Sequence, residues 1–268
     1  MIQEIVMGSQ GGGLGDNLQI TPIFKYFKNS TIQVINSEYG KDIGQGVYNG
    51  LAKVEYHDAP IKQEKSFEIY GNINLSHPLR NGALNYLTIF GIERFVSPIP
   101  IVTLDENTLN ATKEKLKNYS NPIAIVTYGG GFKHPEVNQK YPNHRMLDYD
   151  KWQILINELS KNYTVLHFFK GEPLLKFENC IEISNLSIYE LKHYFAIIKK
   201  YVGIDTGSYH LMLGAGGFAH VLAPQLSWDH QYYPPNWQYP EEFWWDEKIP
   251  RVKYYNKDTE WDKILDFI

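Results

Sequence analysis

The sequence has a single cysteine, Cys180, among its 268 residues. This count excludes an internal disulfide and any metal centre built from several cysteines, and it fits a reducing compartment, which predicts a cytoplasmic location. No apolar run reaches the roughly 18 residues that a membrane-spanning helix needs, so we expect no transmembrane segment. The first ten residues, MIQEIVMGSQ, have no basic stretch before their short apolar run and predict a β-strand rather than a signal peptide.

A strong excess of either charge is also missing. Lysine and arginine together number 26, and aspartate and glutamate number 30, which gives a formal net charge of −4. We therefore expect no bulk electrostatic attraction to nucleic acid or to an anionic membrane surface. The apolar share of 43% and the aromatic share of 15% instead predict a chain that buries a sizeable core.

Segments with the apolar period of a strand alternate with segments that have the period of a helix. Helices are expected near 17–28 and 151–161, and Ser187 with Glu190 forms a capping box before another helix. The final segment, WDKILDFI at 261–268, predicts a helix that packs against one of the domains, and the N-terminal domain is the candidate for this contact. Strands that alternate with helices predict an α/β protein with parallel sheets.

The alternating series is interrupted once, by the linker NYSNP at 118–122, and then restarts with the strand-like IAIVTYGGG. Two such series predict two Rossmann-like domains that face each other across a cleft, one at 1–120 and one at 121–268. Ligands in open α/β sheets bind at the carboxyl ends of the strands. The loops that follow the predicted strands are therefore the places to look for chemistry.

Two common nucleotide fingerprints are absent from these loops. Neither the G-x-G-x-x-G pattern of dinucleotide-binding folds nor the G-x-x-x-x-G-K-[ST] phosphate loop occurs, which argues against a dehydrogenase. The glycine-rich stretch after the first strand, SQGGGLGDNL, ends instead in a carboxylate, Asp16. By residue type, Asp16 is either the N-cap of the next helix or a general base that takes a proton from an incoming hydroxyl.

A second informative loop is DTGSYH, which follows the buried strand YVGI. Thr206 and Gly207 come directly after Asp205 and open a helix, so their amides and the threonine hydroxyl suit a diphosphate. His210 lies one turn further on, where it can donate to the same oxygens. The alternative is a plain strand-to-helix turn, with an aspartate N-cap and a histidine that faces the core.

Three motifs in the same order resemble those of the heptosyltransferase-like glycosyltransferases, which are family 9 enzymes with the GT-B fold. GGLGDNLQITPIFKYFK resembles the opening of that family, and YVGIDTGSYHLMLGAGG resembles its D-T-G-x-x-H motif. IAIVTYGGG, followed later by QKYP, looks like the start of its second domain. Together the motifs span most of the chain, and the resemblance implies a glycosyltransferase of GT-B architecture.

The resemblance also implies roles for individual residues. Asp16 matches the catalytic base proposed for the family, and Gly12, Gly13 and Gly15 belong to the acceptor-side loop around it. Lys140 matches a lysine that contacts the donor phosphates, with Lys133 as the competitor. The full set that matches donor-binding positions is Thr127, Gly129, Gly130, Lys140, Glu172, Asp205, Thr206, Gly207 and His210.

The reaction that the resemblance implies is an inverting sugar transfer without a metal or another cofactor. The co-substrate is a nucleotide-diphosphate sugar, and the acceptor is a glycan or glycolipid hydroxyl. Attack from the face opposite the diphosphate inverts the anomeric centre, and a carboxylate such as Asp16 removes the acceptor proton. Amides, Lys140 and His210 can stabilise the charge that develops on the leaving diphosphate.

Other interpretations of the same residues remain open. A sugar-nucleotide epimerase needs a second acid or base, and none is evident, while a non-catalytic nucleotide-sugar or glycan-binding protein is the third possibility. The DYD sequence at 148–150 resembles a D-x-D metal motif, although Asp150 also fits as the N-cap of the next helix. The aromatic-rich stretch 228–255 suits domain packing more than sugar stacking, with Trp228, Asp229 and His230 nearest the expected cleft.

Overall fold

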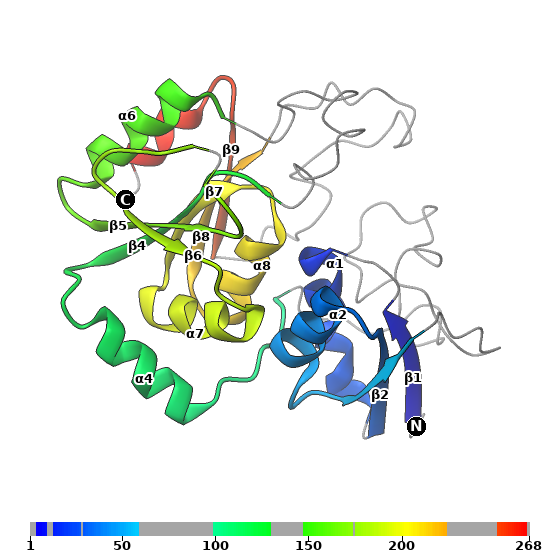
Figure 1. Ribbon diagram of the computed structural model, residues 1–268. Helices are drawn as coiled ribbons and strands as arrows, with labels where there is room; N and C mark the ends of the chain where they lie inside the picture. The colour runs from blue at the N-terminus through cyan, green and yellow to red at the C-terminus, as the bar shows by residue number, and fades with distance from the viewer. Residues whose placement is uncertain are drawn as a thin grey trace, which may run out of the picture.

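The computed structural model describes residues 4–9, 13–27, 29–58, 99–129, 147–173, 175–223 and 251–266. Most of the aromatic-rich stretch 228–255 lies outside these ranges. Figure 1 shows the described chain as two α/β parts, with the N-terminal sheet at one side and a larger sheet at the other.

The N-terminal part contains a parallel sheet with the order β1-β2-β3. Its strands follow the predicted alternation, since helical segments connect each strand to the next along the chain. The elements, in chain order, are β1 (Glu4–Ser9), α1 (Leu14–Gln19), the 3₁₀ helix η1 (Thr21–Tyr26), β2 (Asn29–Ile35), α2 (Glu38–Ile43), the π-helical turn η2 (Gly44–Tyr48) and β3 (Lys53–His57).

The C-terminal part contains a six-stranded parallel sheet with the order β6-β5-β4-β7-β8-β9. Numbered from its own first strand, this is the 3-2-1-4-5-6 order of a doubly wound Rossmann sheet. The direction of winding reverses between β4 and β7, which are neighbours in the sheet. The strands are β4 (Pro122–Val126), β5 (Thr164–Phe169), β6 (Ile181–Ser184), β7 (Lys200–Ile204), β8 (Phe218–Ala223) and β9 (Val252–Asn256).

Helices cover both faces of this sheet, and local sequence signals explain where they begin. Ser187 and Glu190 form the predicted capping box at the start of α7, with the Ser187 hydroxyl accepting from the Glu190 amide at 3.1 Å. Asp105 caps α4 by accepting from the Thr108 amide at 2.8 Å. The helices are α4 (Glu106–Leu116), α6 (Tyr149–Leu159), α7 (Ile188–Ile198), α8 (Gly207–Gly214) and the 3₁₀ helix η4 (Trp261–Asp266).

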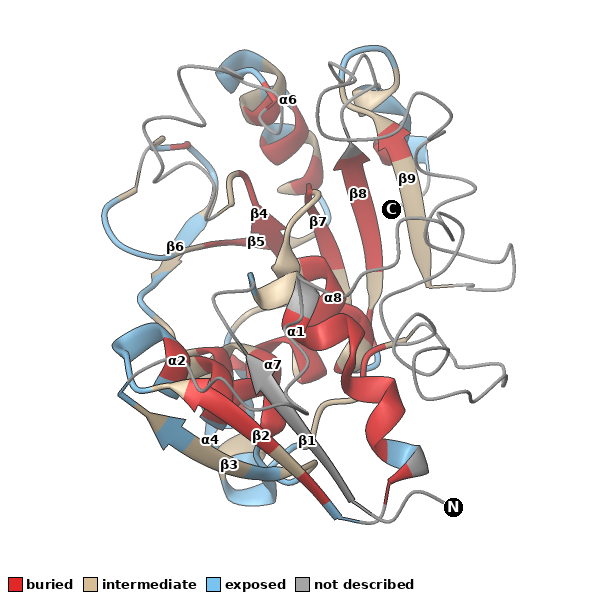
Figure 2. Cartoon of the chain, turned by 90° about the vertical axis from the view of Figure 1, so that its right-hand side faces the viewer, coloured by how far each residue is buried: buried red, intermediate tan, exposed pale blue. Residues whose placement is uncertain are grey.

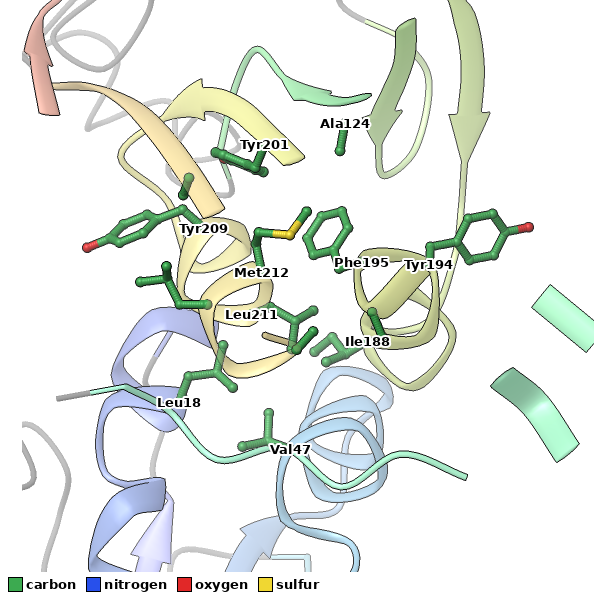
Figure 3. Packing of buried hydrophobic residues seen from close by; sticks show 14 of the residues in the cluster. Leu18, Val47, Ala124, Ile188, Tyr194, Phe195, Tyr201, Tyr209, Leu211 and Met212 are labelled. Atoms are coloured by element: carbon green, nitrogen blue, oxygen red, sulfur yellow. The ribbon is translucent and has the colours of Figure 1, made fainter. Parts of the chain in front are cut away.

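A continuous hydrophobic core joins the two parts. It contains Leu18 of α1 and Val47 of η2 from the N-terminal part, together with Phe195 of α7 and Leu211 of α8 from the C-terminal part. Figure 3 shows Leu18 and Val47 facing this helix pair, and Figure 2 shows the same layer as mostly buried. A separate core lies on the other face of the six-stranded sheet, under α6 and η4. The two sheets are therefore held in one arrangement by packed helices.

Several local expectations need correction. The helix expected at 17–28 is two shorter helices, because Pro22 lacks an amide hydrogen and cannot continue the α-helical pattern. Helix α1 begins after Gly13, so Asp16 lies inside the helix and is not its N-cap. Likewise, Asp148 and not Asp150 stands at the N-cap position of α6.

The C-terminal end differs as well. The strand β9 adds an edge to the sheet and overlaps the end of the stretch 228–255, which we assigned to aromatic packing. The final helix η4 packs against α6 and β9, so it lies on the C-terminal part and not on the N-terminal part. The division at 120/121 stays a prediction, and α4, which precedes it, packs against α7.

Candidate active site

The point where the six-stranded sheet changes its winding direction brings two predicted donor loops together. Thr127 follows the end of β4, and Asp205 follows the end of the neighbouring strand β7. The loops touch, because a Cβ placed on Gly129 would collide with the methyl group of Thr206. Ligands of doubly wound sheets bind at this switch point, outside the carboxyl ends of the strands. The structure thus places Thr127, Gly129, Asp205, Thr206 and Gly207 at one edge of the sheet.

The Asp205–Gly207 turn leads directly into α8, whose first turn carries a short chain of hydroxyl groups. The Thr206 hydroxyl lies 2.6 Å from that of Ser208, which lies 3.1 Å from the phenol oxygen of Tyr201. Burial raises the pKa of Tyr201, so this phenol stays protonated at neutral pH. Thr206 makes no side-chain cap to α8, and the first amides of any helix lack partners within the helix. This helix end is suited to an anion such as a diphosphate.

Thr127, in contrast, is turned into the protein interior. Its side chain is fully buried, and its hydroxyl lies 2.9 Å from Nε2 of His167, which is also buried. Burial lowers the pKa of His167 to about 4, so the ring is neutral at physiological pH. In the described arrangement the Thr127 hydroxyl therefore holds the ends of β4 and β5 together.

Glu172 follows the end of β5, the strand next to β4, and its side chain is exposed. The preceding residue, Gly171, donates its amide to Oδ1 of Asn185 at 2.9 Å, which ties the loop to the end of β6. The predicted carboxylate for the nucleotide ribose is thus at the same edge of the sheet as the switch-point loops.

Helix α1 of the N-terminal part packs directly against α8. A Cβ placed on Gly207 would lie 2.5 Å from the backbone nitrogen of Gly15 and 2.6 Å from Cβ of Leu14. Such distances exclude any side chain at this position, so the glycine permits the close approach. Asp16 follows Gly15 in α1, and its backbone is one residue away from this contact. The two loops predicted to belong to opposite domains therefore meet.

His210 lies beneath this contact with only 3% of its surface exposed. Its Nε2 atom lies 3.2 Å from Nε2 of Gln19 in α1, and its ring packs against that of Tyr209 at a tilt of 32°, with centroids 4.0 Å apart. Burial lowers the pKa of His210 to about 4, with the charge of Asp205 acting in the opposite direction. The ring is therefore neutral, and it belongs to the interface between the two parts.

Some predicted site residues lie outside what the structure describes. The side chain of Asp16 is one, and Gly13 is seen as the N-cap residue of α1. The others outside the described residues are Gly12, Gly130, Lys133, Lys140, Trp228, Asp229 and His230. Their predicted roles stay predictions.

Sequence reasoning missed a set of polar contacts that join the two parts. The Asp42 carboxylate accepts from the Ile188 amide at the start of α7, at 2.7 Å, and from Nζ of Lys170 at 3.0 Å. The buried Lys192 donates to the backbone carbonyl of Gly46 at 3.0 Å, and burial lowers its pKa to about 8. The only sequence signal was a lysine on the apolar side of a helix, which is rare without a partner.

No group of three or more histidine, cysteine, aspartate or glutamate side chains in the described ranges is arranged to hold a metal ion. Among the helices that the described residues form, none has the length and apolar character to cross a membrane.

Solved structures share this architecture, although no protein-family model and no curated protein sequence matches the chain. A family 9 glycosyltransferase from Veillonella parvula DSM 2008 superimposes with a TM-score of 0.64 at 14% identity, covering 95% of this chain and 87% of that one. The dodecameric iron-containing heptosyltransferase TibC, solved with ADP-D-beta-D-heptose, gives a TM-score of 0.55 at 11% identity, covering 98% and 73%.

ADP-heptose lipopolysaccharide heptosyltransferase II of E. coli gives a TM-score of 0.54 at 10% identity, covering 98% of this chain and 96% of that one. At such low identities the likeness concerns the fold, and it agrees with the motifs that first indicated the family. The chain therefore has the GT-B fold of the heptosyltransferase-like family 9 glycosyltransferases.

Proposed function

We propose that the protein is an inverting glycosyltransferase that moves a sugar from a nucleotide-diphosphate sugar to a hydroxyl group of a glycan or glycolipid. The acceptor oxygen forms a bond to the anomeric carbon while the bond from that carbon to the diphosphate breaks. Asp16 takes the acceptor proton, and the nucleoside diphosphate leaves with the electron pair. The cytoplasmic location remains a prediction of the sequence.

The observation that carries this proposal is the contact between Gly15 of α1 and Gly207 of α8. It puts the helix that contains Asp16 against the amide-rich start of α8, at the switch point of the Rossmann sheet. A proton acceptor and an anion site at adjoining positions are what a transfer from a diphosphate requires. The amides at the start of α8, with Lys140 or Lys133, would stabilise the leaving diphosphate without a metal.

The donor is proposed from the named ligand of one structural neighbour. TibC was solved with ADP-D-beta-D-heptose, so ADP-heptose is the first donor to test here. Glu172 is the proposed partner of the nucleotide ribose, since it lies exposed at the carboxyl end of β5.

A thermal-shift screen over ADP-, GDP-, UDP- and dTDP-sugars tests the donor, because a ligand that binds the native state alone raises the melting temperature. At a ligand concentration of 100 times Kd the stabilisation is about 2.7 kcal/mol. The screen is run in the presence of EDTA, since the proposal requires no metal. The anomeric configuration of the product, read by NMR, then tests inversion.

The outcomes separate the candidate functions. Transfer with inversion, in EDTA, supports the proposal. Donor binding without transfer to any acceptor would favour a nucleotide-sugar-binding protein, and conversion of the donor sugar without an acceptor would favour an epimerase.

A further inference from the structure

Gln19 and His210 form a buried polar contact between the two parts of the fold. They are 191 residues apart in sequence, and 9% and 3% of their surfaces are exposed. Leu18, Ile20 and Leu211 surround them in the sequence and are fully buried in the same core. Burying a glutamine amide in such a core is unfavourable unless the amide is hydrogen-bonded. The contact with the His210 ring offsets this desolvation penalty, which an apolar residue at position 19 would not incur.

The contact also assigns a tautomer to the ring. With the amide nitrogen of Gln19 placed against Nε2 of His210, Gln19 donates and Nε2 accepts, which is the neutral tautomer that carries its proton on Nδ1. A neutral ring is consistent with the pKa of His210, which burial lowers to about 4. Any hydrogen bond that His210 donates must therefore come from Nδ1, on the side of the ring away from Gln19.

The positions of the two residues on their helices link both halves of the site. Gln19 lies three residues after Asp16 in α1, and His210 lies three residues after Gly207 in α8. The His210 ring packs against the backbone of Gly15, where an added Cβ would lie 3.2 Å from Cδ2 of the ring. The Gln19–His210 contact therefore ties α1 to α8 within one helical turn of both Asp16 and Gly207.

We propose that Gln19 is a positioning residue, which acts through His210 to hold the helix that carries Asp16 against the Asp205–Gly207 turn. This role rests on the proposed function, since it presumes that the two elements react with the same donor and acceptor. The pair sets the geometry of transfer and does not contribute the affinity for the nucleotide.

The test compares Gln19→Leu, which removes the hydrogen bond at similar volume, with a matched control. Gln33→Leu changes the other buried glutamine of the described N-terminal part, which lies in β2. We expect Gln19→Leu to lower kcat by about tenfold or more, because small misplacements of reacting groups are costly, and to leave the donor KM within about threefold. Folded Gln33→Leu is expected to have the kcat of the wild type, even if its free energy of unfolding is lower.

A spectroscopic readout tests the same contact without activity. In protein labelled with ¹⁵N-histidine, the wild type should show His210 protonated on Nδ1 and unprotonated on Nε2. Gln19→Glu keeps the length of the side chain, and its ionised carboxylate can only accept, so it should move a proton to Nε2 of His210. This variant also covers the case in which Gln19→Leu fails to fold.

The results that overturn the proposal are specific. His210 ring resonances that neither Gln19→Leu nor Gln19→Glu changes, or a folded Gln19→Leu variant with the kcat of the wild type, refute the positioning role. A wild type that transfers sugar from no donor refutes the proposed function instead, whatever the spectra of His210 show.

Discussion

Gly15 and Gly207 belong to different parts of the fold, yet a Cβ on Gly207 would lie 2.5 Å from the backbone nitrogen of Gly15. The two helix starts can approach this closely only without a side chain at 207. Because α1 contains Asp16 and α8 follows the Asp205–Gly207 turn, this approach defines the candidate active site.

Replacing Gly207 by alanine should therefore separate α1 from α8. We expect Gly207→Ala to lower the free energy of unfolding by about 1–3 kcal/mol, as at other overpacked sites. We also expect the folded variant to transfer sugar more slowly than the wild type. Gly15→Ala is the matched variant, since its Cβ would meet the His210 ring at 3.2 Å and no atom closer. Urea unfolding of both variants should show the larger effect for Gly207→Ala, and equal effects would contradict the account.

The Thr127–His167 pair predicts a strongly non-additive double mutant. Thr127→Val leaves the buried Nε2 of His167 without its hydroxyl partner, which should cost about 1–3 kcal/mol. Changing both residues, Thr127→Val with His167→Leu, removes the polar groups together and should recover part of that loss. Denaturant unfolding of the two single variants and the double variant gives the coupling, and strictly additive losses would refute the buried bond.

Three buried histidines predict how stability changes at acidic pH. Burial lowers the pKa of His167, of His210 and of His220 to about 4, from an ordinary value of 6.5 in the unfolded chain. Between these values the unfolded state binds more protons, so the free energy of unfolding should fall as the pH drops from about 6.5 to about 4. Across this pH window the free energy of unfolding should fall less steeply in the Thr127→Val/His167→Leu variant than in the wild type. An unchanged slope would show that His167 titrates normally.

Lys192 predicts a change in the alkaline range. Burial lowers its pKa to about 8 from an ordinary 10.5, so above pH 8 the unfolded state holds a proton that the folded state releases. Stability contributed by this group therefore rises from pH 8 toward pH 10.5. The measurement is the difference in unfolding free energy between the wild type and Lys192→Met at several pH values from 8 to 9.5. This difference should change with pH in favour of the wild type, and a constant difference would contradict a lowered pKa.

Sequence patterns predicted the local features of this fold well. The Ser187–Glu190 capping box and the apolar stripe of α6 depend on residues within two turns of one another, so they can be recognised from spacing alone. The helix expected at 17–28 was wrong because the apolar period was given more weight than Pro22. The strand β9 was missed because its tyrosines suggested aromatic packing rather than an added edge to the sheet.

The candidate site was predicted only in part. The switch-point loops follow from the alternation of strands and helices, which fixes where the carboxyl ends of β4 and β7 meet. The Gln19–His210 and Asp42–Ile188 contacts could not be predicted, because they join residues 191 and 146 positions apart and depend on how the two parts dock. No local pattern marks a polar residue as the partner of another across such an interface.

The most direct test of the central claim is single-turnover transfer by Asp16→Asn, with the donor identified by thermal shift. The variant removes the proton acceptor and keeps the size of the side chain. We predict that the rate of transfer falls by about 10²–10⁴-fold, as for the loss of a general base, while the Kd for the donor stays within about threefold of the wild type. Transfer at the rate of the wild type would contradict the assignment of Asp16 as the base.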